Sequence, residues 1–161
     1  FMLAPSLEQV EGRGQLRQTS LDPRSSPAIH QHFGENQRDT TRHVNALVDA
    51  LALTEIEPLS EFVADVVFPD LARTGRRDLE QLARRFSASG YHPCGTAKMG
   101  PADDPSAVVD QYGRCHTVGQ LAVADASIMP TVPRANINLS SIMIGEKIGE
   151  WLRTEPARYG L

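Results

Sequence analysis

The chain has 161 residues, which is enough for one ordinary domain with a core of its own. Its apolar fraction of 40% and charged fraction of 22% are close to those of typical globular proteins. Sixteen basic and 20 acidic residues give a net charge of −4, and no basic run is interleaved with aromatic residues, so the sequence argues against a nucleic-acid-binding protein.

Membrane insertion and secretion are not expected either. No stretch reaches the roughly 18 apolar residues that a membrane-spanning helix needs. The first residues lack the charged and apolar regions of a signal peptide. The two cysteines, Cys94 and Cys115, do not form a disulfide framework. We therefore expect reduced thiols in a cytoplasmic protein.

Two short strands are predicted near the N-terminus, after a linker, loop or short helix over residues 1–11. Glycines punctuate the alternating segment 15–19, and residues 28–33 alternate again. Residues 21–27 contain two prolines, an aspartate and two serines, a composition that is typical of a turn.

Apolar spacing predicts two clear helices before residue 90. The first spans residues 39–53 and has an apolar face formed by Val44, Leu47, Val48 and Leu51. Asp39, Thr40 or Thr41 can cap its start. The second spans residues 76–87, with Leu79, Leu82, Ala83 and Phe86 on one face. Between them, residues 58–72 form a weaker helical stretch that prolines interrupt.

The residue composition changes at Gly90. Glycine and proline become dense, and we expect irregular structure as far as Asp110. Two short strand candidates follow between Arg114 and Ala124. The second, Leu121–Ala124, is continuously apolar, which suits a strand buried on both faces. A last helix is predicted from residue 138 to residue 153. Loops beside a buried strand are common places for active sites.

The first candidate for chemistry is His92, which precedes Pro93. Proline keeps the preceding residue extended, and Gly95 and Gly100 permit close approach of the backbone. A rigidly held imidazole suits general-base chemistry near neutral pH. The residues alone favour the simpler alternative, a histidine that only forms a hydrogen bond within a turn.

Other candidates lie near the last helix. Asn136 or Asn138 can bind a substrate oxygen, and Asn138 is expected to cap the helix. The helix N-terminus itself suits an anion. The turn at Asp125 and Ala126, after the predicted buried strand, is either a cofactor contact or a simple turn. Cys115 and its neighbouring histidine lack a second pair at ligand spacing, so no metal site is expected.

Four blocks together resemble the C-terminal part of the glucose–methanol–choline (GMC) oxidoreductase family. Residues 92–100 read HPCGTAKMG and are similar to the family's HPxGTxxMG. Residues 107–110 (AVVD), 123–131 (VADASIMPT) and 136–147, which begins with NIN and ends with IMIGEK, resemble the blocks that follow it. The strong resemblance covers about residues 90–153.

The resemblance implies roles for individual residues. His92 matches the family's candidate base, and Asn136 matches its partner position, which is histidine or asparagine. Asp125 and Ala126 match the turn that touches the flavin pyrophosphate and ribityl region. Asn138 and Leu139 match the helix start beneath the flavin pyrimidine edge. The implied reaction oxidises an alcohol to a carbonyl, with hydride passing to the FAD.

The resemblance also implies an α/β (α+β) architecture. Residues 12–112 would be part of a substrate-binding domain of antiparallel strands and helices, with an active-site loop at 90–100. Residues 113–161 would complete the FAD-binding domain with a final strand and helix. The family's glycine fingerprint, GxGxxG, does not occur in this chain. A partner chain or segment carrying it is therefore expected.

Two alternatives remain open at this point. One is a hydroxynitrile-lyase-like member of the same scaffold, in which the flavin stays idle in redox chemistry. The other is a non-catalytic interaction subunit. The alcohol and the electron acceptor are not specified by the sequence.

Overall fold

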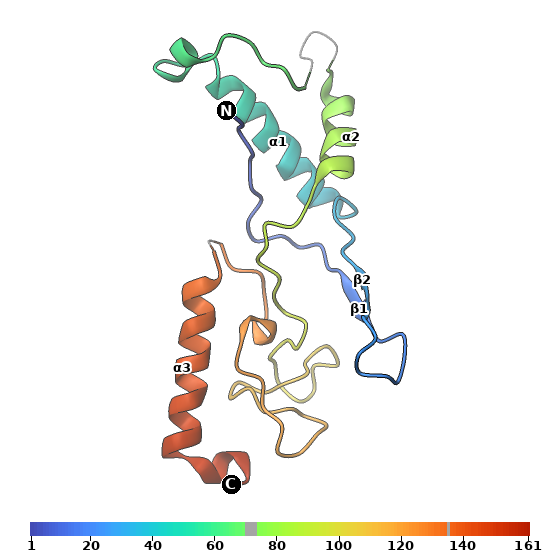
Figure 1. Cartoon of the computed structure of the whole chain (residues 1–161), viewed down its shortest axis with the longest axis vertical. Coiled ribbons are helices and arrows are strands. Elements are labelled where there is room, and N and C mark those ends of the chain that lie inside the picture. Colours follow the sequence, from blue (N-terminus) through green and yellow to red (C-terminus); the bar gives the residue numbers. More distant parts are fainter. Residues whose placement is uncertain (70–73, 135) are drawn as a thin grey trace. The chain divides into compact units, whose positions relative to one another are not determined.

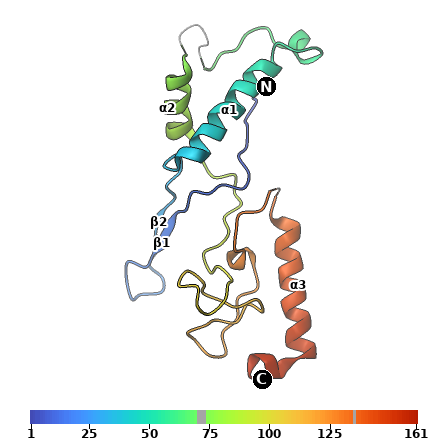
Figure 2. The ribbon, with the colours of Figure 1, turned by 180° about the vertical axis from the view of Figure 1, so that it is seen from behind.

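The chain folds into two compact units, residues 1–90 and 91–161. The computed structural model describes residues 1–69, 74–134 and 136–161. Figures 1 and 2 show the ribbon from opposite sides. Strands β1 and β2 and helices α1 and α2 belong to the first unit, and helix α3 belongs to the second. Within the described ranges, no helix is both long and apolar enough to cross a membrane.

The first unit begins with a two-stranded antiparallel sheet. Strands β1 (Gln15–Arg17) and β2 (Ala28–His30) pair with Leu16 opposite Ile29. Both predicted strands are confirmed, but each is only three residues long. The second ends before His32, whose φ of 53° is left-handed and breaks the extended backbone. A sheet of two strands is marginally stable alone.

Helix α1 (Gln37–Leu53) begins two residues earlier than predicted. Its N-cap is Asn36, whose side-chain oxygen accepts a hydrogen bond from the backbone N–H of Asp39 over 3.0 Å. The prediction that Asp39, Thr40 or Thr41 caps the helix is therefore wrong. The Asp39 carboxylate lies within the first turn and has other partners.

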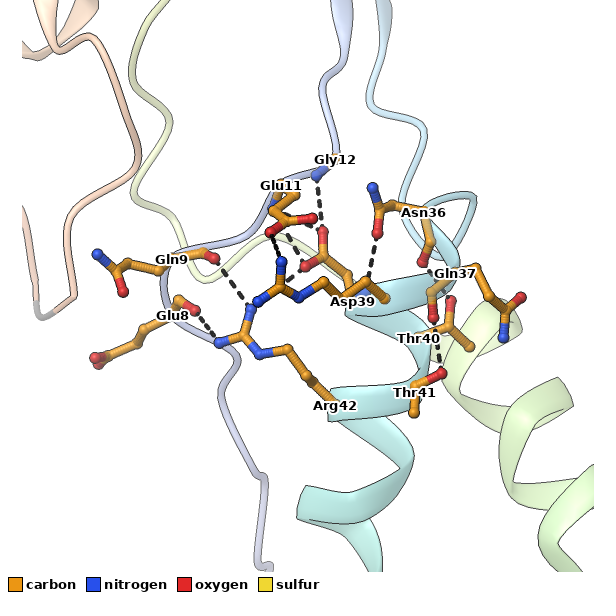
Figure 3. Close-up of polar contacts among 11 residues, drawn as sticks. Glu8, Gln9, Glu11, Gly12, Asn36, Gln37, Asp39, Thr40, Thr41 and Arg42 are labelled. Carbon is orange, nitrogen blue, oxygen red and sulfur yellow. Dashed lines mark hydrogen bonds and ion pairs between the residues drawn. The ribbon is translucent and has the colours of Figure 1, made fainter.

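Those partners form a polar clamp between the N-terminal segment and α1 (Figure 3). The buried Asp39 carboxylate accepts hydrogen bonds from the backbone N–H groups of Glu11, at 2.9 Å, and Gly12, at 2.7 Å. Arg42, one turn further along, donates to the carbonyl oxygens of residues 8–9 and pairs with Asp39 at 3.4 Å. The clamp fixes the chain just before β1.

Helix α2 (Arg76–Phe86) packs on α1, as Figures 1 and 2 both show. Val44, Leu79 and Ala83 form the buried core between them. The predicted helix and most of its apolar face are confirmed, although Phe86 is 60% exposed. This pair of helices buries the core of the first unit, because three- and four-residue spacings align apolar side chains on one face.

The weaker helical stretch predicted over residues 58–72 is only a single 3-10 turn. That turn, η1, spans Leu59–Phe62, and residues 63–69 are irregular. The last part of the predicted stretch, residues 70–72, lies outside the described residues.

The second unit is organised by short backbone contacts and one long helix. Isolated β-bridges join Met99 to Val109, Val109 to Cys115, and Arg114 to Ala122. The predicted irregular segment and the predicted last helix, observed as α3 (Asn138–Thr154), are confirmed. Two 3-10 turns, η2 (Ala126–Ile128) and η3 (Pro156–Tyr159), flank α3 in sequence. The buried core comprises Val109, Ile128, Met129, Ile137, Ile144, Ile148 and Tyr159.

The segment Leu121–Ala124 differs from the strand buried on both faces that its apolar run predicts. It forms a single bridge, with hydrogen bonds from Cys115 N–H to the Leu121 carbonyl and from Val123 N–H to the Gly113 carbonyl. Leu121 is 48% exposed. Burial on both faces requires a packed layer above and below a sheet. Within the described residues this segment is hydrogen-bonded along one edge only, so it does not lie inside such a sheet.

Candidate functional site

The loop that carries His92 is held along the turn η2. Three alternate N–H groups of the loop donate to three successive carbonyl oxygens of the turn. The pairs are Gly95 to Ala126 at 3.2 Å, Ala97 to Ser127 at 2.9 Å and Met99 to Ile128 at 2.8 Å. The structure therefore brings together two segments, 92–100 and 125–129, that the sequence marks separately as candidate substrate and cofactor contacts.

Gly95 allows this close approach. Its φ is +80°, a region that L side chains rarely adopt, and a Cβ there would lie 3.2 Å from the carbonyl oxygen of Met129. A side chain at this position would press on the backbone of the turn. We call the three hydrogen bonds between the loop and the turn the ladder. The glycine is thus required where the ladder begins, three residues after His92.

The other edge of the same loop is fixed by the segment that follows it. The carbonyl oxygen of Lys98 accepts a hydrogen bond from Val108 N–H over 2.8 Å. The Lys98 ammonium lies 2.6 Å from the Asp104 carboxylate and 2.8 Å from the hydroxyl of Ser106. Hydrogen bonds from Lys98 and Ser106 hold the pKa of Asp104 well below its usual value. Asp104 therefore anchors the loop to the segment that follows it.

The turn at Asp125 is closed by its own side chains. One carboxylate oxygen, Oδ1, accepts hydrogen bonds from both the hydroxyl of Ser127, at 2.5 Å, and its backbone N–H, at 2.8 Å. These bonds lower the pKa of Asp125, because they stabilise the ionised form. Ala126 packs against the core of the second unit. Ala126 thus accepts the first hydrogen bond from the His92 loop, and Asp125 directly precedes it.

The two predicted catalytic residues are exposed. The structure gives His92 no hydrogen bond within the described residues, and the same is true of Asn136. Among the described residues, no hydrogen bond joins the two side chains. Asn136 adjoins residue 135, which lies outside the described residues. Their proposed cooperation on one oxygen atom stays a prediction.

Helix α3 starts without a side-chain cap. Its N-cap is Ile137, so Asn138 is the first helical residue and the prediction that it caps the helix is wrong. No acidic residue lies in the first turn, and Leu139 is 78% exposed. The first N–H groups of a helix have no partner inside the helix. An uncapped, exposed start therefore retains the partial positive charge that favours an anion.

A hollow of about 430 Å³ lies elsewhere in the second unit, between the segment 114–122 and the C-terminal residues. None of the predicted site residues lines it. Cys115 does, and hydrogen bonds from the backbone and hydroxyl of Thr117 and from the N–H of Val118 lower the pKa of its thiol. No disulfide joins Cys115 to Cys94. No metal-ligating cluster occurs within the described ranges.

Ser127 is the residue of this region that the sequence interpretation missed. It lies in the block VADASIMPT, for which the sequence suggests roles only at Asp125 and Ala126. The signal that could have found it is local: an Asp followed two residues later by Ser is the spacing at which a carboxylate receives a backbone N–H in an Asx turn. Its contact with the His92 loop could not be found in this way, because that contact uses backbone atoms only.

A family model described as GMC oxidoreductase matches residues 10–145, most of the chain. The chain belongs to the GMC oxidoreductase family. Over 141 residues it is 35% identical to the oxygen-dependent choline dehydrogenase 1 of Chromohalobacter salexigens. That alignment covers 88% of this chain and 25% of the relative, so the chain spans about a quarter of that relative's length. The resemblance inferred from the four blocks is confirmed.

Solved GMC structures share the fold. Pyridoxine 4-oxidase from Mesorbium loti is 26% identical, with a TM-score of 0.79 over 87% of this chain and 27% of that one. A formate oxidase from Aspergillus oryzae RIB40, studied for its FAD modification, is 24% identical, with a TM-score of 0.80 over 91% of this chain and 25% of that one. The predicted fold class, the C-terminal part of a GMC oxidoreductase, is confirmed.

Proposed function

We propose that this chain is the C-terminal part of an FAD-dependent GMC oxidoreductase that oxidises an alcohol to a carbonyl compound. The ladder between the His92 loop and the Asp125 turn carries the proposal, because it joins a candidate base to a candidate cofactor contact. Family membership supports it. Choline and pyridoxine, which name two of the similar enzymes, are both alcohols.

The chain's own residues fit FAD at two places. Asp125 and Ala126 lie on a turn that is fixed by hydrogen bonds and by the core. Asn138 and Leu139 begin the uncapped helix α3, whose partial positive charge suits the negative charge that develops on a reduced flavin ring. When bound, FAD accepts the electron pair and the hydrogen that leave the alcohol carbon.

His92 and Asn136 act on the alcohol in this proposal. A ring nitrogen of His92 takes the hydroxyl proton as the carbon–oxygen double bond forms, which is the usual work of a general base. The ring makes no hydrogen bond within the described residues, so it has no internal partner to give up. The amide of Asn136 orients the same oxygen by a hydrogen bond. The loop positions the His92 imidazole, since its backbone is fixed from Gly95 onward.

The rest of the active site comes from an N-terminal FAD-binding part that carries a GxGxxG turn. The chain's coverage of only a quarter of its relatives supports this arrangement. Residues 12–112 then belong to the substrate-binding domain, and residues 113–161 complete the FAD-binding domain.

The test uses this chain produced together with that N-terminal part. The purified protein is expected to be yellow, and anaerobic addition of choline, benzyl alcohol or pyridoxine is expected to bleach the flavin. His92→Ala should slow flavin reduction by about 100-fold or more, the usual scale for loss of a general base, with FAD content unchanged. Asn136→Ala should slow it less, because only an orienting hydrogen bond is lost.

His30→Ala is the matched control, since His30 is an exposed histidine at the end of β2 and belongs to no proposed site. It should reduce at the parent rate. Parent-rate reduction in His92→Ala would refute the base assignment. A yellow protein that no alcohol bleaches would refute the oxidoreductase and favour the lyase-like alternative.

A further inference from the structure

Ser127 uses three of its polar groups at the centre of the proposed site. Its hydroxyl and its backbone N–H both donate to Oδ1 of Asp125, over 2.5 and 2.8 Å. Its carbonyl oxygen accepts the N–H of Ala97 over 2.9 Å. One residue is therefore bonded to the turn proposed to contact FAD on one side and to the loop that carries His92 on the other.

The rung made by Ser127 is the middle one of the three in the ladder. The turn is also held by packing, because Ile128 and Met129 are buried in the core of the second unit. The side-chain bond from Ser127 to Asp125 is a further restraint on the same turn. His92 lies three residues before the first rung, with Pro93 restricting the backbone between them.

We propose that Ser127 is a positioning residue that acts through Asp125 and Ala97 to hold the His92 loop against the cofactor turn. The inference rests on the proposed function. Ser127 itself performs no proton transfer. Its hydroxyl keeps the carbonyl oxygens of the turn aligned with the N–H groups of the loop, and the loop in turn fixes where the imidazole can reach.

The experiment measures anaerobic flavin reduction in the complete enzyme, with whichever of choline, benzyl alcohol and pyridoxine reduces the parent fastest. Ser127→Ala is expected to slow reduction about tenfold at saturating alcohol, since small displacements of a catalytic group carry large rate penalties. FAD content and the alcohol's apparent dissociation constant should stay near parent values. Ser127→Thr keeps the hydroxyl and should therefore keep the rate within about threefold of the parent. A threefold change corresponds to less free energy than one hydrogen bond contributes.

Two readouts separate positioning from general stability. In a His92→Ala background, Ser127→Ala should cause no further loss, because its effect passes through the histidine. Hydrogen exchange should rise in a peptide covering residues 95–99 of the Ser127→Ala enzyme. Ser20→Ala is the control: the Ser20 hydroxyl is also bonded within a turn, where it accepts the N–H of Asp22, but this turn lies in the β1–β2 connection. The substitution should change neither readout.

The proposal fails if Ser127→Ala reduces at the parent rate, if its loss persists in full without His92, or if exchange at 95–99 is unchanged. If Ser127→Ala does not bind FAD, Ser127→Cys takes its place, because cysteine preserves the volume with a much weaker donor. Failure of the base assignment is distinct: it shows in the His92→Ala single variant, whatever Ser127 does.

Discussion

Gly113→Ala tests whether the backbone contacts of the second unit have the geometry described. Gly113 is buried, with a φ of +74°. A Cβ added there would overlap the carbonyl oxygen of Val123 and lie 2.8 Å from Cδ1 of Ile148. The Ile148 methyl can rotate away. The Val123 carbonyl cannot, because it belongs to the backbone that leads into the Asp125 turn.

The expected cost has three sources. Left-handed backbone costs an L residue about 1–2 kcal/mol. Displacing Val123 weakens its hydrogen bond to the Gly113 carbonyl, which is worth about 1 kcal/mol. Overpacking of the added Cβ against the Val123 backbone adds about 1–3 kcal/mol. Together these predict a local destabilisation of about 4 kcal/mol, and since each 1.4 kcal/mol is a factor of ten, local opening should become about 1,000-fold more frequent.

Hydrogen exchange of a peptide covering residues 113–124 in the complete enzyme measures this opening. Gly119→Ala is the matched control, because no heavy atom of the described residues, its two chain neighbours aside, lies within 4 Å of its added Cβ, and its φ is not left-handed. The control should leave exchange unchanged or slow it slightly. Equal exchange in the two variants, or a change below about threefold in Gly113→Ala, would refute the packing argument, since that is well under 1 kcal/mol.

Two further predictions concern carboxylates. Asp39→Ala should destabilise the first unit by about 3 kcal/mol, because two backbone N–H groups of segment 8–12 lose their acceptor; exchange of that segment measures the effect, and the exposed Asp49→Ala should show none. Asp104→Asn should lower the midpoint of thermal unfolding at pH 7. Because the folded pKa of Asp104 is depressed, its stabilisation is present above the ordinary carboxyl pKa near 4 and is lost as the pH falls below it. The difference between parent and variant should therefore shrink below about pH 4, while the neighbouring Asp103→Asn should match the parent throughout. A difference that persists unchanged at pH 3 would contradict the Asp104 argument.

The helices of this chain could be predicted from the sequence because their signal is local. Val44 and Leu79 are buried where the three- and four-residue spacing of α1 and α2 places them. The residues at which the helices begin were harder to predict from the sequence. The start of α1 depends on a competition between Asn36 and Asp39 for backbone N–H groups, and Asp39 instead satisfies a segment 27 residues away.

The candidate site could be predicted only as separate pieces. The blocks around His92 and Asp125 are recognisable by their residues, but the ladder that joins them pairs N–H and carbonyl groups, which every residue has. No periodicity marks such a contact. Side-chain chemistry could suggest which residues act. It could not suggest that the loop after His92 and the turn after Asp125 are bonded to each other.

The departure at Leu121–Ala124 agrees with the proposed arrangement of the enzyme. A continuous apolar run predicts burial on both faces, yet Leu121 is 48% exposed in this chain. Helix α3 repeats the pattern: Ile144 and Ile148 are buried, whereas Leu139 and Met143 are 78% and 62% exposed. A helix with one face in water normally carries polar residues on that face, whereas α3 carries large apolar side chains at helical spacing on both faces. The sequence pattern therefore describes an environment larger than this chain, and an FAD-binding part packed on α3 and beside residues 121–124 would supply it.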